Sequence, residues 1–305
     1  MNFIKYKWFY FLISGIVIVP GLFSLVFWGL KPSIDFTGGT LLELEFTKAI
    51  SNEPASTEVS AGRQLAIRES LDELKIDYSS VQTSGEKRIL IKAKPMTRGE
   101  VSSIIGTVAE KVGEKPAELR FDTVGPTLGK ELIKKTLIAI LLGAGFILLY
   151  VWKQFKEPMY GVCAVLAMFH DSLVLLGVFS LLGHFKGIEI DTLFVTAVLT
   201  TLSLSVHDTV VVYDRIRESK KRFPGVLLSS LADKAITETL PRSINNSMTI
   251  ILMLLALYLL GGSTMKWFVF ALLVGTISGT YSSTFIASPL LVVWEELKNK
   301  KKILK

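Results

Sequence analysis

The chain alternates between long apolar segments and shorter polar ones, and this pattern predicts membrane-spanning helices. A transmembrane helix needs roughly 20 consecutive apolar residues. Six segments approach or exceed that length, at about 8–30, 132–152, 159–182, 190–213, 243–261 and 267–294. The pattern therefore predicts a polytopic α-helical membrane protein with six transmembrane helices.

Residues 31–130, between the first two apolar runs, have the patterns of a mixed α and β domain. The segment 40–46 alternates at Leu42, Leu44 and Phe46, as a strand with one buried face does. The predicted elements in chain order are a strand at 40–46, a helix at 56–75, a hairpin around Gly85 and Glu86, a helix that opens with the capping box Thr97 and Glu100, and a strand at 117–124. This β-α-β-β-α-β order predicts an α+β ferredoxin-like domain between helices 1 and 2.

The domain organisation follows from these segments. The first apolar run is too long for a signal peptide and lacks an Ala-x-Ala site, so we expect it to remain as a membrane anchor. We expect a cytoplasmic N-terminus and helix 1 in residues 1–30, an external domain in 31–130, helices 2–6 in 131–294 with a cytoplasmic amphipathic loop at about 214–242, and a basic cytoplasmic tail in 295–305.

Basic residues predict the orientation of the six helices. Seven arginines and lysines lie in 214–242, five lysines lie in the tail 298–305, and two lie in the link 152–158. The alternate connections, 183–189 and 261–266, carry one lysine each. Because cytoplasmic loops carry the excess of basic residues, we expect both termini in the cytoplasm and residues 31–130 outside.

Charge and cysteine content narrow the classes of function. The formal net charge is +7, but residues 31–130 hold 14 basic and 15 acidic side chains, a net charge of −1. The positive charge therefore belongs to the cytoplasmic side, where anionic lipid accounts for it, and we expect no nucleic-acid partner. Cys163 lies in a membrane run, so the external domain must fold without a disulfide.

Two His-Asp pairs lie within apolar runs, His170-Asp171 and His207-Asp208. A charged side chain near the bilayer centre costs about 2.5–3.5 kcal/mol, so each acid is a candidate functional group, the alternative being a polar contact between helices. Adjacent residues on a helix point about 100° apart, so we expect neither pair to share one binding face and expect no metal site. We expect the polar stretch 200–205 to line the approach to Asp208.

Two further patterns concern packing. Segment 226–240 is amphipathic, and we expect its apolar face, at Leu227, Leu228, Leu231, Ala235 and Ile236, to contact lipid at the membrane interface. Small residues in the last apolar run recur every four positions, which favours close helix contact, and we expect this stripe to contribute to partner contact. The stripe consists of Ala271, Gly275, Gly279, Ser283 and Ala287.

Six motifs together resemble the SecD/SecF family of protein-export membrane proteins, and its SecF branch in particular. They are IDFTGGT after the first helix, VGP before the second, FHD in the third, HDTVVVYDRIRE in the fourth, LPRSINNS entering the fifth and GTISGTYSSTFIASP in the sixth. This family belongs to the resistance-nodulation-division superfamily. The resemblance covers nearly the whole chain, with the motifs in the expected order.

The resemblance implies a multi-pass subunit of the bacterial inner membrane. It implies SecD as partner beside the SecYEG translocon, with SecA-driven preproteins as cargo and YajC and YidC as further candidate partners. The implied function is use of the proton-motive force in late steps of export. The protein would then be no enzyme, and protons, as the coupling ion, would take the place of any cofactor.

The resemblance also assigns candidate proton-transfer residues. Asp208 matches the acid of the family's proton path, and Arg242 matches an arginine implicated with it. Relatives often have Asn at the position of His207, which leaves open whether His207 transfers protons or only hydrogen-bonds. Asp171, with His170, is either a relay residue or a contact that holds the helix bundle together.

Other classes of function predict other features. A small-molecule or lipid exporter half of the same superfamily would carry a larger external domain. An intramembrane enzyme would need a nucleophile or an Asp pair in a frame such as Gly-x-Gly-Asp, which the chain lacks. A purely structural subunit is expected if SecD carries all of the proton chemistry.

Overall fold

A computed structural model describes residues 2–47, 54–84, 87–155, 157–262 and 265–303. The chain divides into two compact units, one formed by Met1–Lys31 with Leu137–Lys305 and the other by Pro32–Thr136. The second unit corresponds to the predicted external domain at 31–130, but it also takes in the first residues of the following helix.

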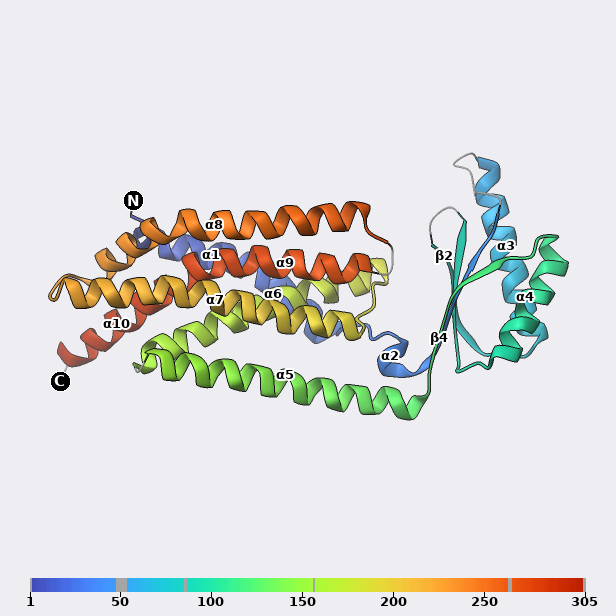
Figure 1. Ribbon diagram of the computed structural model, residues 1–305, viewed down its shortest axis with the longest axis horizontal. Coiled ribbons are helices and arrows are strands. Elements are labelled where there is room, and N and C mark those ends of the chain that lie inside the picture. The colour runs from blue at the N-terminus through green and yellow to red at the C-terminus, as the bar shows by residue number, and fades with distance from the viewer. Residues whose placement is uncertain (1, 48–53, 85–86, 156, 263–264, 304–305) are drawn as a thin grey trace. The chain divides into compact units, whose positions relative to one another are not determined.

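The first unit is a bundle of long apolar helices (Figure 1). Each predicted span contains a helix long and apolar enough to cross a membrane. The helices are α1 (Lys7–Phe27, preceded by η1, Ile4–Tyr6), α5 (Pro126–Phe155), α6 (Pro158–Lys186), α7 (Thr192–Arg222), α8 (Leu228–Leu260), α9 (Lys266–Ser282) and α10 (Ser288–Ile303). Burial is uneven, because half of the apolar window of α6 is buried but none of that of α5.

The segment 214–242, predicted as a cytoplasmic amphipathic loop, is largely helical. Helix α7 continues to Arg222 and α8 begins at Leu228, so the helices are separated by only a short connection. The apolar face of segment 226–240 does not contact lipid, contrary to the expectation. Its residues Leu228, Leu231, Ala235 and Ile236 are all at most 4% exposed within the bundle. Only Leu227 of that face is exposed.

The stripe of small residues on α9 packs inside the chain, against α7. A Cβ atom at Gly275 would lie 2.0 Å from Cγ2 of Thr201, and one at Gly279 would lie 3.3 Å from Cα of Ser205. Ala271, Ser283 and Ala287 are fully buried. The stripe is therefore used for contact between α7 and α9, and it gives no support to the expectation that it meets a partner.

A similar close approach joins α1 to α6. A Cβ atom at Gly177 would lie 2.7 Å from Cα of Gly21. One turn along each helix, the hydroxyls of Ser24 and Ser180 are 2.6 Å apart and hydrogen-bonded. Absence of side chains at the two glycines thus allows polar groups of α1 and α6 to meet directly.

The last predicted span is not one regular helix. A π-helical segment, η3 (Ser283–Ala287), lies between α9 and α10. The Tyr213 hydroxyl of α7 donates a hydrogen bond of 2.8 Å to the carbonyl oxygen of Ala287. π-Helical segments interrupt the regular backbone bonding and are frequent at functional sites.

The second unit has the predicted order of elements. Its strands are β1 (Gly39–Glu45), β2 (Tyr78–Ser84), β3 (Arg88–Ala93) and β4 (Ala117–Val124), with helices α2 (Ile34–Thr37), α3 (Pro54–Glu73) and α4 (Arg98–Val112). The strands form one sheet in the order β2-β3-β1-β4, and every neighbouring pair is antiparallel. The predicted hairpin turn, Gly85 and Glu86, lies outside the described residues.

Helices α3 and α4 cover the same face of this sheet (Figure 1). Leu42, Leu44 and Phe46 are fully buried, as their alternation predicted, and they pack with Ile67 and Leu71 of α3. The Thr97 and Glu100 capping box that opens α4 is present. This unit therefore has its own apolar core.

Glycines allow two tight features where α2 leads into β1, a positive φ at Gly38 and Gly39 and a close contact with Gly129 of α5. Gly38 and Gly39 have φ angles of 75° and 135°, values at which residues with a Cβ atom are strained. A Cβ atom at Gly129 would lie 2.7 Å from the carbonyl oxygen of Phe36. The two predicted flanking turns, IDFTGGT and VGPTLG, therefore pack backbone to backbone.

Candidate functional site

The two His-Asp pairs belong to two different polar clusters in the helical unit. His207 and Asp208 lie on α7 and face α8, whereas His170 and Asp171 lie on α6 and contact α1, α7 and α9. Among the described residues, no hydrogen bond joins Asp208 to Asp171 directly.

Asp208 lines a polar cavity of about 250 Å³ between α7 and α8. Its polar lining also includes His207, Arg242, Ser243 and Asn246. The Ser243 hydroxyl donates a hydrogen bond of 2.9 Å to Oδ2 of Asp208. A space of this size with polar groups in its wall can hold water beside the Asp208 carboxyl group.

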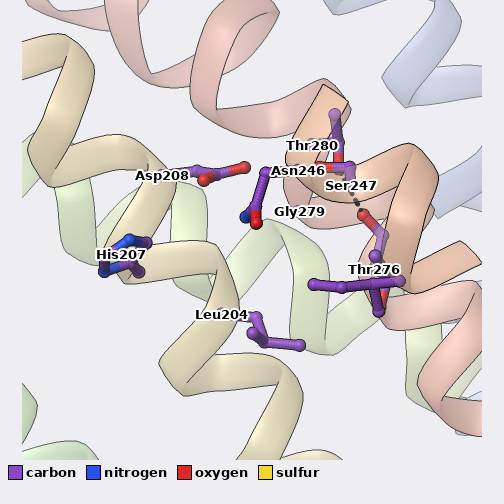
Figure 2. A pocket seen from close by; sticks show the side chains of 9 residues that line it. Leu204, His207, Asp208, Asn246, Ser247, Thr276, Gly279 and Thr280 are labelled. Atoms are coloured by element: carbon purple, nitrogen blue, oxygen red, sulfur yellow. Dashed lines mark hydrogen bonds between the residues drawn. The ribbon is translucent and has the colours of Figure 1, made fainter. Parts of the chain in front are cut away.

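A second, smaller pocket of about 20 Å³ adjoins Asp208 and reaches α9. Figure 2 shows the side chains of Asp208 and Asn246 directed toward one another across it, whereas His207 points in another direction from α7. On its far wall, Thr280 of α9 donates a hydrogen bond of 2.7 Å to Ser247 of α8. Hydroxyl and amide groups of two helices, α8 and α9, thus lie around the carboxyl group of Asp208.

Arg242 lines the same cavity as Asp208. Arg242 is exposed, and the hydrogen bond described for the Asp208 carboxyl group comes from Ser243 instead. Pro241 lies within α8 directly before Arg242. Because proline has no backbone N–H, α8 lacks one hydrogen bond of its ladder next to these side chains.

Asp171 is the more buried of the two acids, at 4% exposure. Three hydroxyl groups from two other helices donate to its carboxylate. They belong to Ser205 of α7 (2.5 Å) and to Ser278 and Ser282 of α9 (2.6 Å each). A fourth contact joins Nδ1 of His170 to Oδ1 over 3.0 Å. Asp171 therefore connects the three helices at the centre of the bundle.

These contacts correct two expectations. His170 and Asp171 do share one site, because their side chains bend toward one another although their Cα–Cβ bonds diverge. The polar stretch 200–205 does not line the approach to Asp208 throughout, because Ser205 is buried and donates to Asp171. Thr201 likewise faces Gly275 of α9.

Serine residues that complete both clusters were missed as site residues in the sequence. Ser278 and Ser282 are four residues apart, a spacing that places them on one helix face and could have identified them as a pair. Ser243 directly follows Arg242, and Ser14 is one of two serines in the first apolar run. No sequence pattern shows which acid each serine contacts, because that depends on how the helices pack.

Within the described residues, no group of three or more His, Cys, Asp or Glu side chains has a geometry suited to a metal ion. The side chains of the two clusters present carboxyl, imidazole, guanidinium, amide and hydroxyl groups. Proton uptake and release are the reactions common to the first two.

Comparison with known sequences identifies the family. The family profile described as "Protein export membrane protein SecD/SecF, C-terminal" matches residues 104–297, and the "SecD/SecF GG Motif" matches residues 23–50. The chain is 40% identical over 302 residues to protein translocase subunit SecF of Thermobaculum terrenum, covering 97% of this chain and 94% of the relative. It is 39% identical over 300 residues to the SecF subunit of Anaerolinea thermophila, with the same coverage.

Comparison with solved structures agrees with the sequences. The crystal structure of SecDF from Thermus thermophilus, a translocon-associated membrane protein, matches with a TM-score of 0.81 and 31% identity over 97% of this chain. A SecDF structure in a super-membrane-facing form matches with a TM-score of 0.70 and 30% identity. The chain spans only 39% and 40% of those two longer chains. On its sequence motifs, its six apolar helices and these relatives, this chain belongs to the SecD/SecF family of protein-export membrane proteins, among the SecF translocase subunits.

Proposed function

We propose that this chain is the SecF-type half of a proton-driven assembly that promotes late steps of preprotein export. Asp208 would bind and release the coupling proton, and Arg242 would modulate it. The chain would be no enzyme, and protons would be the coupling ion in place of a cofactor.

The observation that carries this proposal is the cavity shared by Asp208 and Arg242. A carboxyl group in a membrane-spanning helix costs free energy, so such residues are rare and mark functional positions. Here it faces a space large enough for water, beside a guanidinium group and an imidazole. This arrangement supports exchange of a proton at Asp208, with the charge of the carboxylate balanced by the Arg242 side chain.

We further propose that the partner is a SecD-type subunit. The SecDF chains in the solved structures are more than twice as long as this chain, so the remainder of such a chain would be supplied here by a second subunit. Helix α5 supports this idea, because none of its apolar window is buried within the chain. SecYEG, SecA-driven preproteins, YajC and YidC are further proposed partners.

We place the protein in the bacterial inner membrane with both termini in the cytoplasm, on the distribution of basic residues. The unit Pro32–Thr136 would then lie outside as a ferredoxin-like domain. Its β-α-β-β-α-β order, four-stranded sheet and separate apolar core support that assignment.

The test is export of a preprotein into inverted membrane vesicles that contain Asp208→Asn. Asparagine is nearly isosteric with aspartate and still hydrogen-bonds, but it cannot exchange a proton with water. We expect the variant to insert and pair normally, to lose the uncoupler-sensitive part of export, and to keep the ATP-driven part. Arg242→Gln should lose the same part, because it removes the guanidinium group that lines the cavity.

Asp214→Asn is the matched control. Asp214 is also on α7, six residues beyond Asp208, and its carboxylate pairs with Arg217 at 3.0 Å. We expect its uncoupler-sensitive export to equal that of the unmodified chain. A full uncoupler-sensitive component in Asp208→Asn vesicles would show that Asp208 is only a contact between helices.

A further inference from the structure

A chain of hydrogen bonds runs from α1 through α6 to α7 and α9, separately from the cavity at Asp208. Ser14 of α1 contacts Nε2 of His170 over 2.9 Å. Nδ1 of His170 contacts Oδ1 of Asp171 over 3.0 Å. Asp171 in turn binds Ser205, Ser278 and Ser282. The imidazole of His170 therefore lies between a hydroxyl group and a carboxyl group, with both ring nitrogens in contact.

If Asp171 is ionised, its contacts define which nitrogen of His170 carries a proton. Oδ1 receives the Ser278 hydroxyl and faces Nδ1 of His170, and Oδ2 receives the hydroxyls of Ser205 and Ser282. An ionised carboxyl group only accepts hydrogen bonds. All four contacts fit that state if Nδ1 of His170 is protonated, so the ring is oriented by Asp171 in both of its charge states.

Nε2 is then the nitrogen that can gain or lose a proton. Its partner is a serine hydroxyl, which both donates and accepts hydrogen bonds. Ser14 donates to Nε2 when the ring is neutral and accepts from it when the ring is charged. The second proton can thus be taken up without displacement of a heavy atom, and imidazole is the side chain whose ordinary pKa lies nearest neutral pH.

The surroundings of His170 supply one charge of opposite sign and a space beside the ring. Tyr281 of α9 faces the imidazole with ring centroids 6.4 Å apart, and its hydroxyl donates to the carbonyl oxygen of Tyr10 on α1. Asp208 is the acid nearest in sequence to Ser205, but it lines the two cavities next to α8 and not the one beside His170. A cavity of about 310 Å³ between α1, α6 and α9 has Ser14, His170 and Tyr281 in its wall, but most of its lining is valine and isoleucine, so the space beside the ring is largely apolar.

We propose that His170 is a second proton-binding site of this protein and that Nε2 is the atom that is protonated. Asp171 is its counter-ion. Ser14 of α1 reverses the direction of its hydrogen bond with Nε2 when the ring becomes charged. Loading forms one N–H bond from a hydronium ion and releases water, and unloading reverses this step. The inference deepens the proposed function, since it rests on protons being the coupling ion. Helix α1 leads directly into the unit Pro32–Thr136, so this site acts on the helix that carries that unit.

The test is ¹⁵N NMR of the histidine ring nitrogens in the full chain, reconstituted in lipid bilayers. The chain has three histidines, so His184→Gln with His207→Gln leaves His170 as the only labelled ring. Between about pH 5 and about pH 9, a range that brackets the ordinary imidazole pKa, we expect Nδ1 to remain protonated while Nε2 changes from unprotonated to protonated. One unchanged protonation state of Nε2 over this range, or loss of the Nδ1 proton, would overturn the proposal.

Two variants separate the proposed roles from simple packing. Asp171→Asn should release the tautomer, so that neutral His170 shows both Nδ1-protonated and Nε2-protonated signals. Ser14→Ala should change the Nε2 signal, whereas Ser24→Ala should leave both nitrogens unchanged, because Ser24 forms the neighbouring contact of α1 with Ser180 and does not touch His170. An equal response to Ser14→Ala and Ser24→Ala would contradict the role of Ser14.

This experiment is independent of the export assay on Asp208. Loss of uncoupler-sensitive export in Asp208→Asn with a His170 ring that does not titrate would support the proposed function and sink the second site. A titrating His170 with undiminished uncoupler-sensitive export in Asp208→Asn would do the reverse.

Discussion

Substitution of Gly275 by alanine tests the packing of α9 on α7, on which both polar clusters depend. The added Cβ atom would lie 2.0 Å from Cγ2 and 2.6 Å from Cβ of Thr201, where ordinary contacts begin at 3.4 Å. Rotation about the Cα–Cβ bond of Thr201 moves Cγ2 away but leaves Cβ in place. The strain therefore cannot be relieved by a change of rotamer, and the helix backbones must separate.

The expected magnitude is that of overpacking in a close-packed interior, about 1–3 kcal/mol of unfolding free energy. Gly145→Ala on α5 is the control, because no atom lies within 4 Å of a Cβ at that position. Both changes replace a helical glycine by alanine, so their helix propensities cancel. We expect Gly275→Ala to be less stable than Gly145→Ala by about 1–3 kcal/mol in reversible unfolding of the full chain in mixed micelles, followed by circular dichroism.

A second substitution at Thr201 identifies the contact. Thr201→Gly removes the obstructing Cβ atom. The double variant with Gly275→Ala should therefore lose less unfolding free energy than the two single variants lose together. Thr201→Ser removes Cγ2 only, so it should rescue less. Equal unfolding midpoints for Gly275→Ala and Gly145→Ala would refute the tight contact and with it the described packing of α7 against α9.

Two predictions concern the unit Pro32–Thr136 studied in isolation, which we expect to unfold in one cooperative thermal transition by circular dichroism. Leu71→Ala should destabilise it by about 2–5 kcal/mol because a fully buried side chain is lost, whereas Leu65→Ala on the same helix, 58% exposed, should change little. Hydrogen bonding from the Thr97 backbone lowers the pKa of Glu100 below its usual value, so ionised Glu100 stabilises the folded unit above the unfolded pKa and this contribution is lost as the pH falls through the folded pKa. Glu100→Gln should therefore lower the melting temperature at neutral pH but progressively less in acid, and a pH-independent difference would contradict this role.

Local pattern determined much of this protein directly. Six apolar runs of sufficient length predict six membrane helices because a helix in lipid must satisfy its backbone within one segment. Alternation at Leu42, Leu44 and Phe46 and the capping box at Thr97 likewise depend only on near neighbours, and the structure confirms both. The family motifs are also short stretches of sequence, so the membership that the profiles confirm was visible in them.

Tertiary structure decided what those residues touch. Hydropathy alone did not show that residues 228–242 belong to the same helix as the following apolar run, where Leu231 and Ile236 are buried in the bundle. Spacing on one helix suggested that His170 and Asp171 point apart, yet both turn toward one site because Ser205 and the α9 serines gather around Asp171 from other helices. A side-chain partner from another helix has no fixed sequence separation, so only the packing of α6, α7 and α9 could assign the serines to one acid and the cavity to the other.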